Sequence, residues 1–351
     1  MAEKEYIEVD GRKIRIRPKE IETEIDENGY FHRQPNHFTT GFGDGEGLNP
    51  VEAGRYHLVW AKLCHWSNRA AIVRELLGLE DAIGVSIADH GEYKNLGWEF
   101  TQAPNHVDPA LGIRFLSEAY YKADDDYAGR TTVPALIDVT TGKVVNNDYN
   151  RLTNYFEVEF KPLQKKDAPD LYPEHLRREI DELNEWLFDN INNAVYKAVF
   201  ARSKDAFWDA YNTFYAAMDI LEKRLENQRF LFGDYVTDSD VRLYVTLARL
   251  DIRYTWQLGE TKKPLFAYKN LWPYARDLYQ IPAFRNNTYF RDFANPKKKK
   301  GQLMESFNAR FLDQIDFEGI WGAAHNRARL SSDSAHKFLG ERMDAGYGTV
   351  R

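Results

Sequence analysis

The stretch Cys64-His65-Trp66-Ser67-Asn68-Arg69 lies where a strand is expected to pass into a helix. The run before it, residues 56–60 (YHLVW), is aromatic and β-branched, which is typical of a strand. From residue 66 onward, apolar residues recur every three or four positions, which predicts a helix. Cys64, the only cysteine among 351 residues, therefore lies at the first turn of that helix.

A thiol in this position meets unpaired backbone N–H groups and the positive end of the helix dipole. Both favour the nucleophilic thiolate, so the sequence indicates thiol-transfer or redox chemistry at Cys64. This interpretation requires an ionised sulfur that solvent can reach. The alternative is a cysteine that serves as a small buried hydrophobic residue.

Composition excludes several classes of protein. Hydrophobic residues make up 43% of the chain, and the net charge of -7 argues against a general nucleic-acid binder. A single cysteine excludes an internal disulfide and a thiolate zinc site, and the nine histidines lack HExxH spacing, so we expect no metal. The N-terminus lacks the apolar segment of a signal peptide, and no run reaches the roughly 20 apolar residues of a membrane helix. We expect a cytoplasmic protein without a membrane partner.

The chain divides into four predicted regions. Residues 1–50 are polar and rich in glycine, and form an N-terminal arm with one possible hairpin near residues 6–16. Residues 51–162 alternate strands and helices in the order βαβ, helix, ββ, helix, with an insertion over residues 89–108. This order predicts an α/β thioredoxin-like domain. Pro134 lies at the start of its third strand, where that fold has a cis proline facing the active thiol.

Residues 163–285 form the third region, and from about residue 174 to residue 285 apolar residues recur at helical spacing, which predicts an all-α domain. Thr237 and Asp240 have the spacing of a capping box at the start of one helix. Residues 286–351 form a less regular C-terminal extension, and its basic run, residues 297–300, is interpreted as a solvated loop.

The order of short motifs along residues 30–285 resembles the xi-class glutathione transferases, the glutathionyl-hydroquinone reductases. The motifs that carry the resemblance are Gly54-Arg55-Tyr56-His57-Leu58, Gly97-Trp98-Glu99-Phe100, Tyr121-Lys122-Ala123-Asp124, Gly129-Arg130, Thr132-Val133-Pro134, Val145-Asn146-Asn147-Asp148, Val195-Tyr196-Lys197, Asp240-Val241-Arg242-Leu243-Tyr244, Arg253-Tyr254 and Arg276-Asp277-Leu278-Tyr279-Gln280.

The resemblance implies a reductase that removes glutathione from glutathionyl-hydroquinones through a mixed disulfide with Cys64. It implies that Val133 and cis-Pro134 bind the cysteinyl backbone of glutathione. Asp148, beside Tyr149, is then expected to take the free ammonium group.

The resemblance also assigns roles outside these loops. Arg130 and Trp98 are expected to flank a carboxylate or the peptide edge of the thiol. Tyr196 and Tyr254 are expected to bind the hydroquinone oxygens or to donate the proton that the ring carbon gains. Core tyrosines are the alternative for these two residues. The resemblance further implies glutathione as co-substrate and a homodimer.

Three departures from the family pattern point to a divergent member. The family usually reads Cys-Pro-Trp-Ala-His-Arg at the thiol, whereas this chain has His65, Ser67 and Asn68 within that stretch. His65 either supports the thiolate or is exposed, and Ser67 is expected to cap or pack rather than to react. Asp148-Tyr149 stands where the family usually has Glu-Ser, and the C-terminal aromatic and histidine segment is not recognisable after residue 289.

These departures leave two other functions open. One is a conjugating transferase or thiol-transferase that uses glutathione or another small thiol. The other is a non-enzymatic binding protein with an unreactive Cys64.

Overall fold

The computed structural model describes residues 4–259, 262–294, 314–333 and 337–339. The predicted basic loop, residues 297–300, lies outside the described residues. The chain forms two compact units, one of residues up to Glu27 together with His32–Gln164, the other of Asn28–Phe31 together with the residues from Lys165 onward. The boundary after Gln164 lies next to the predicted one after residue 162.

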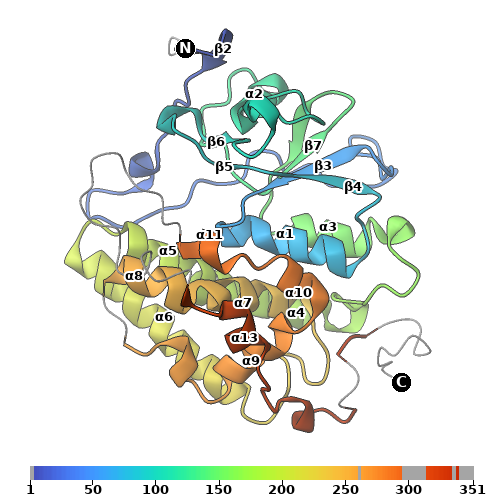
Figure 1. Ribbon diagram of the computed structural model, residues 1–351, viewed down its shortest axis with the longest axis vertical. Helices are drawn as coiled ribbons and strands as arrows, with labels where there is room; N and C mark the ends of the chain where they lie inside the picture. The colour runs from blue at the N-terminus through green and yellow to red at the C-terminus, as the bar shows by residue number, and fades with distance from the viewer. Residues whose placement is uncertain (1–3, 260–261, 295–313, 334–336, 340–351) are drawn as a thin grey trace. The chain divides into compact units, whose positions relative to one another are not determined.

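The first unit is built on a four-stranded sheet with the strand order β4-β3-β7-β8. Its strands are β3 (Tyr56–Trp60), β4 (Ile83–Ile87), β7 (Ala135–Asp138) and β8 (Lys143–Asn146). The β3–β4 pair is parallel, and the β3–β7 and β7–β8 pairs are antiparallel. Helices α1 (His65–Leu76) and α3 (Leu152–Val158) lie on one face of the sheet, and α2 (Leu116–Ala123) lies on the other (Figure 1). This arrangement confirms the predicted thioredoxin-like domain.

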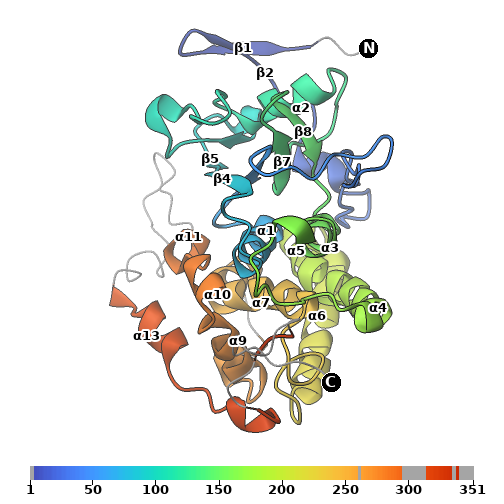
Figure 2. The same cartoon turned by 90° about the vertical axis from the view of Figure 1, so that its right-hand side faces the viewer.

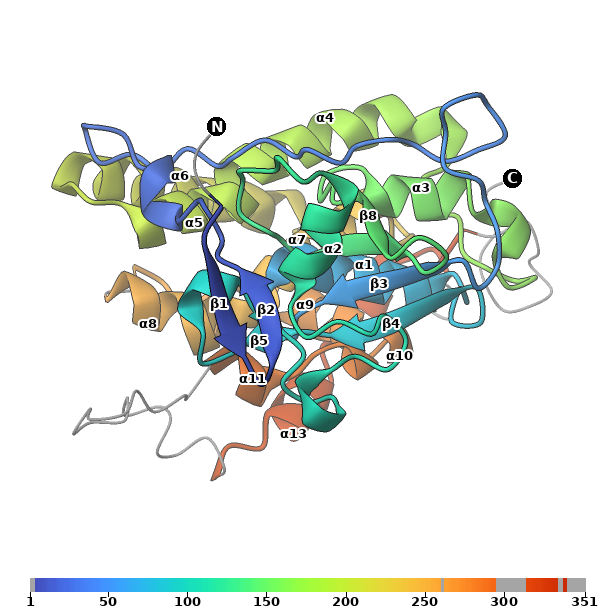
Figure 3. The same cartoon turned by 90° about the horizontal axis from the view of Figure 1, so that it is seen from above.

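Two small hairpins extend the first unit. The predicted N-terminal hairpin is present as β1 (Tyr6–Val9) and β2 (Arg12–Arg15), and it packs on α2 (Figure 2). Figure 3 shows the same hairpin beside α2 from above. The insertion after β4 contains β5 (Asp89–His90) and β6 (Trp98–Glu99). Buried Leu96 and Phe115 join the hairpin to the insertion through a small shared core.

The second unit is helical, which confirms the predicted all-α domain. All twelve residues of α7 are buried, so this helix forms the centre of the unit. The α-helices of this unit are α4 (Arg177–Leu187), α5 (Asn193–Phe200), α6 (Lys204–Arg224), α7 (Asp238–Arg249), α8 (Thr255–Leu258), α9 (Leu271–Tyr279), α10 (Pro282–Asn286), α11 (Phe290–Ala294) and α13 (Phe317–Gly322). Two π-helical turns, Phe188–Asn192 and Leu250–Tyr254, interrupt this series.

The predicted cap at the start of α7 is present. The Asp240 carboxylate accepts the Thr237 N–H at 2.8 Å and the Thr237 hydroxyl at 3.0 Å. It also accepts the hydroxyl of Tyr274 at 2.7 Å, so the cap ties α7 to α9. Within the described ranges, none of the helices has the length and apolar character needed to cross a membrane.

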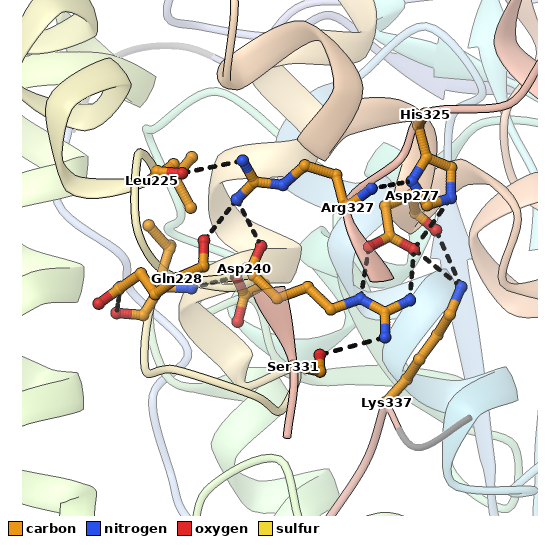
Figure 4. Close-up of polar contacts among 10 residues, drawn as sticks. Leu225, Gln228, Asp240, Asp277, His325, Arg327, Ser331 and Lys337 are labelled. Carbon is orange, nitrogen blue, oxygen red and sulfur yellow. Dashed lines mark hydrogen bonds and ion pairs between the residues drawn. The ribbon is translucent and has the colours of Figure 1, made fainter. Parts of the chain in front are cut away.

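The C-terminal residues join the helical unit through buried charge (Figure 4). Asp277 on α9 is fully buried, and its carboxylate meets Arg229 at 2.7 and 3.1 Å. Lys337 and His325 from the C-terminal segment approach the same carboxylate at 2.9 and 3.3 Å. Arg327 donates to the backbone carbonyls of Leu225, Gln228 and Arg229. Through these contacts, part of the predicted C-terminal extension packs as a component of the helical unit.

Candidate functional site

Cys64 lies at the turn between β3 and α1, where it is the N-cap residue of α1 with φ -84° and ψ 118°. Its N–H donates to the Ala61 carbonyl at 2.9 Å, and its carbonyl accepts the Asn68 N–H at 3.0 Å. The side chain makes no capping hydrogen bond, so the sulfur is not used to close the helix end. Its Sγ lies 3.9 Å from the carbonyl oxygen of Val133. The residue is 6% exposed, so only a small part of it is open to solvent.

Ser67 holds the turn that presents Cys64. Its side chain is fully buried, and its Oγ accepts the Ala61 N–H at 3.1 Å. The same hydroxyl lies 3.4 Å from the carbonyl oxygens of Ala61 and Cys64. These are contacts with the backbone of the turn, as the packing interpretation of Ser67 predicts.

Trp66, two residues after Cys64, packs in a cluster with Arg33 and Tyr149. The Arg33 guanidinium carbon lies 4.4 Å from the ring centre of Trp66 and 5.5 Å from that of Tyr149, and the two rings are 4.9 Å apart. Burial raises the pKa of the Tyr149 phenol, and the charge of Arg33 opposes that shift. Trp66 and Arg33 thus hold the ring of Tyr149, the residue that stands where the family usually has a serine.

His65 is 1% exposed, so the interpretation of this residue as an exposed histidine is wrong. Its ring packs edge-on against Trp66, with 4.3 Å between ring centres. The helical periodicity of this stretch does not reveal that burial.

The loop before β7 carries the predicted cis proline. The Val133–Pro134 peptide bond is cis, which confirms that prediction, and Pro134 directly precedes the first residue of β7. The buried phenol of Tyr120 donates to the Thr132 carbonyl at 2.7 Å, and burial raises the pKa of this phenol far above its usual value. Tyr120 of α2 therefore holds this loop, and the carbonyl oxygen of Val133 faces the Cys64 sulfur.

Arg130 and Trp98 lie in different surroundings. The Arg130 guanidinium pairs with the buried carboxylate of Glu24 from the arm. Trp98 is half-buried and stacks on its cross-strand partner His90, with ring centres 4.3 Å apart and planes 18° apart. The insertion that carries Trp98 is fixed by the buried ion pair of Glu99 with Arg114 at 2.8 Å.

Asp148 lies after β8 and just before α3, and it is 9% exposed. Its Oδ1 accepts the Asn36 side-chain amide at 2.7 Å and the backbone N–H groups of Asn150 and Arg151 at 2.9 and 3.2 Å. A short carboxylate side chain with backbone donors on one oxygen has the geometry to receive a cationic group on the other.

Tyr196 and Tyr254 belong to the helical unit. Tyr196 lies on α5, and Tyr254 ends the π-helical turn Leu250–Tyr254. Their ring centres are 6.3 Å apart, so the structure brings these two predicted residues together. Such π-turns are frequent at functional sites.

Sequence reasoning missed the arm residues Glu24, Arg33 and Asn36, each of which contacts a predicted site residue. Asn36 and Asp148 are separated by 112 positions, so no local pattern joins them. Within the described part of the chain, no group of three or more histidine, cysteine or acidic side chains is arranged to hold a metal ion.

Comparisons with known proteins place this architecture in a family. Residues 173–277 match the family "Glutathione S-transferase, C-terminal domain". The chain is 37% identical over 253 residues to the glutathionyl-hydroquinone reductase YqjG of Escherichia coli, covering 72% of this chain and 76% of YqjG. The chain belongs to the xi-class glutathione transferases, the glutathionyl-hydroquinone reductases.

Solved structures of this family have the same fold. The xi glutathione transferase of Phanerochaete chrysosporium is 36% identical, with a TM-score of 0.72 over 77% of this chain and 88% of that one. The glutathione-bound structure of Escherichia coli YqjG is 31% identical, with a TM-score of 0.70 over 86% of this chain and 97% of that one.

Proposed function

We propose that this xi-class transferase is a glutathione-dependent reductase that removes glutathione from glutathionyl-hydroquinones. The observation that carries the proposal is the placement of Cys64 at the N-terminus of α1, with its sulfur facing Val133 beside a cis proline. Membership in the glutathionyl-hydroquinone reductases supports the same activity.

In the first step, the Cys64 thiolate attacks the sulfur of the glutathionyl-hydroquinone. The Cys64–glutathione S–S bond forms as the carbon–sulfur bond breaks, and the electron pair goes to the ring carbon. That carbon takes a proton, for which Tyr196 and Tyr254 are the proposed donors, and the hydroquinone leaves. The ring carbon is reduced, and the two sulfurs are oxidised to a disulfide.

In the second step, the thiolate of a further glutathione attacks the mixed disulfide. Oxidised glutathione leaves and the Cys64 thiolate is restored. Glutathione is therefore a co-substrate, and the chemistry requires no metal. A reducing compartment such as the cytoplasm suits this step, because it depends on reduced glutathione.

The residues proposed to bind glutathione lie in the first unit. Val133 is proposed to pair through its backbone with the cysteinyl unit, and Asp148 to bind the ammonium group. Trp98 is proposed to flank the peptide edge. Arg130 is already paired with Glu24, so its proposed role is to shape that edge rather than to supply an unpaired charge. Family resemblance leads us to propose a homodimer, which light scattering of the purified protein tests.

The experiment combines the protein with glutathionyl-menadiol and reduced glutathione and measures released menadiol. We expect release by the native protein and none by Cys64→Ala. Intact mass after exposure to oxidised glutathione should show one glutathione adduct on the native chain only, since Cys64 is its single cysteine. An absence of released menadiol from the native protein would reject the reductase function.

The departure at Asp148-Tyr149 favours a second candidate, a conjugating transferase or thiol-transferase that uses glutathione or another small thiol. The Tyr149 ring packs on Trp66 and Arg33 where the family usually has a serine hydroxyl. Glutathione adduct formation without release of menadiol would favour this candidate. A thiol that forms no adduct at any pH would instead indicate a binding protein.

A further inference from the structure

Residues of the N-terminal arm contact the loops that carry the proposed thiol-binding side chains. The Glu24 carboxylate pairs with the Arg130 guanidinium. The Gln34 side chain accepts the Arg130 N–H at 2.8 Å and donates to the Arg130 carbonyl at 2.9 Å. Both the charge and the backbone of Arg130 are therefore held by the arm.

The arm makes a second set of contacts after β8. The Asn36 amide donates to Asp148 Oδ1 at 2.7 Å. Two residues further on, the Phe38 N–H donates to the Asn147 side chain at 3.0 Å, and the Phe38 carbonyl accepts the Asn147 N–H at 2.8 Å. The hydrogen bonds between Phe38 and Asn147 fix the register of the arm against this loop, and in that register Asn36 lies opposite Asp148.

The hydrogen bonds to Asp148 are unequal between its two oxygens. Across the described part of the chain, those that its carboxylate accepts all end at Oδ1. The side chain is 9% exposed, so rotation away from this position would give up three donors at a largely buried group. The three hydrogen bonds therefore fix the orientation of the carboxylate through Oδ1, and Oδ2 retains its capacity to accept a hydrogen bond.

The Asp148 side chain has a single methylene group, so its carboxylate stays close to the backbone of the loop and the donors on Oδ1 decide its orientation. Asn36 supplies a side-chain donor from a segment 112 positions away in the chain. The other two donors are the backbone N–H groups of Asn150 and Arg151, which belong to the same loop as Asp148.

We propose that Asn36 is a positioning residue that orients Asp148 to recognise the free α-ammonium group of the thiol peptide. The arm thereby becomes part of the specificity site for γ-glutamyl thiols with an unblocked amine. This inference rests on the proposed function, since it assigns the ammonium group of the same substrate to Asp148.

The test compares native protein with Asn36→Ala on two substrates, glutathionyl-menadiol and its N-acetylated form, in which the ammonium group is absent. For glutathionyl-menadiol we expect KM to rise about tenfold with kcat unchanged within about twofold, the size of one hydrogen bond to a charged group. For the N-acetylated substrate we expect native and variant KM to agree. Asn36→Ser, which keeps a donor, should restore part of the lost affinity.

The matched control is His32→Ala, an exposed arm residue whose ring contacts Asp26. It should leave KM for both substrates unchanged. An equal rise in KM for both substrates in Asn36→Ala would overturn the proposal, because Asn36 would then support the loop in general. Unchanged KM for glutathionyl-menadiol would overturn it as well.

Calorimetric titration of glutathione and N-acetylglutathione into each protein separates this inference from the reductase function. Tight glutathione binding that weakens in Asn36→Ala, without turnover of any conjugate, would support the ammonium assignment and reject the reductase. No glutathione binding by the native protein would reject both.

Discussion

Two buried carboxylates, Asp148 and Asp277, show how the same group serves different ends in the two units. Asp277 is fully buried, and Arg229, Lys337 and His325 meet both of its oxygens. Asp148 keeps 9% exposure, and among the described contacts its donors meet one oxygen. A carboxylate whose two oxygens both meet buried cations stabilises a fold, whereas one whose donors meet a single oxygen keeps acceptor capacity for a ligand.

The largest expected effect is on the chemistry of the first unit. Cys64→Ser should lower menadiol release at least about a thousandfold, because a hydroxyl cannot form the mixed disulfide. The melting temperature should stay within about 2 °C, since the Cys64 side chain makes no capping bond. Turnover rates and thermal melts of the same preparations check both points, and retained release would exclude Cys64 as the nucleophile.

The next effect concerns the stability of the second unit. Asp277→Ala should lower the free energy of unfolding by about 3–5 kcal/mol, because it leaves buried cations without their carboxylate. Asp148→Ala should lower it by less, about 1–2 kcal/mol, because three donors lose their acceptor at a site that keeps some exposure, and it should weaken glutathione binding. Urea unfolding and calorimetry measure the two quantities, with the milder Asp277→Asn as a variant that keeps the side-chain volume. Equal destabilisation by the two alanine variants would remove the contrast.

Loss of a phenol should affect only the step that involves the ring. Tyr196→Phe or Tyr254→Phe should lower kcat for glutathionyl-menadiol about a hundredfold if that residue donates the proton. Adduct formation with oxidised glutathione should remain at the native rate, because that exchange requires no ring protonation. Rapid-quench mass spectrometry follows both reactions, and a parallel loss in both would point to a packing role for the phenol.

The smallest effect is the pH dependence of the Asp277 cluster. Burial lowers the pKa of His325, with Asp277 acting against that shift and Lys337, Arg229 and Arg276 adding to it. The unfolded chain then binds the proton first, near the usual histidine pKa of about 6.5, so stability falls as pH decreases below that value.

Asp277 adds a second loss at lower pH. Burial alone would raise its pKa, but Arg229, Lys337 and His325 together lower it. Its stabilising contribution is present above the usual aspartate pKa and is lost as pH falls through the lowered value. Melting temperatures should decline as the pH falls from about 7 to 5 because of His325, and again below about pH 4 because of Asp277; His325→Gln should show less of the first decline. If the melting temperatures of native protein and His325→Gln fell equally with pH, protonation of His325 would not contribute to the pH dependence.

Local patterns were sufficient for most of the fold. The β-branched run of β3, the helical period of α1 and the spacing of Thr237 and Asp240 each depend on neighbouring residues, so a single segment contains the whole signal. The cis conformation at Pro134 was predicted by analogy with the thioredoxin-like fold and is present. The roles assigned to the site residues stay predictions.

Other features depend on distant segments that no periodicity connects. The burial of His65, the pairing of Arg130 with Glu24 and the stacking of Arg33 on Trp66 were not foreseen. The C-terminal segment was described as an extension, yet Arg327 and Lys337 engage the helical unit through buried polar contacts. For the contacts of Arg33, Arg130 and the C-terminal segment, the partner lies too far along the chain for a window of ten or twenty residues to include it.

The order of strands and helices and the helix-start position of the single thiol are contained in the amino-acid sequence, because dihedral preferences and apolar spacing act between near neighbours along the chain. The family follows from the resemblance of short motifs. The contacts of the arm with Arg130 and Asp148, and the burial of Asp277 among cations, become visible only in the folded chain. Such pairings arise when folding removes charged groups from water, because each group must then find its partner wherever the packed chain places one.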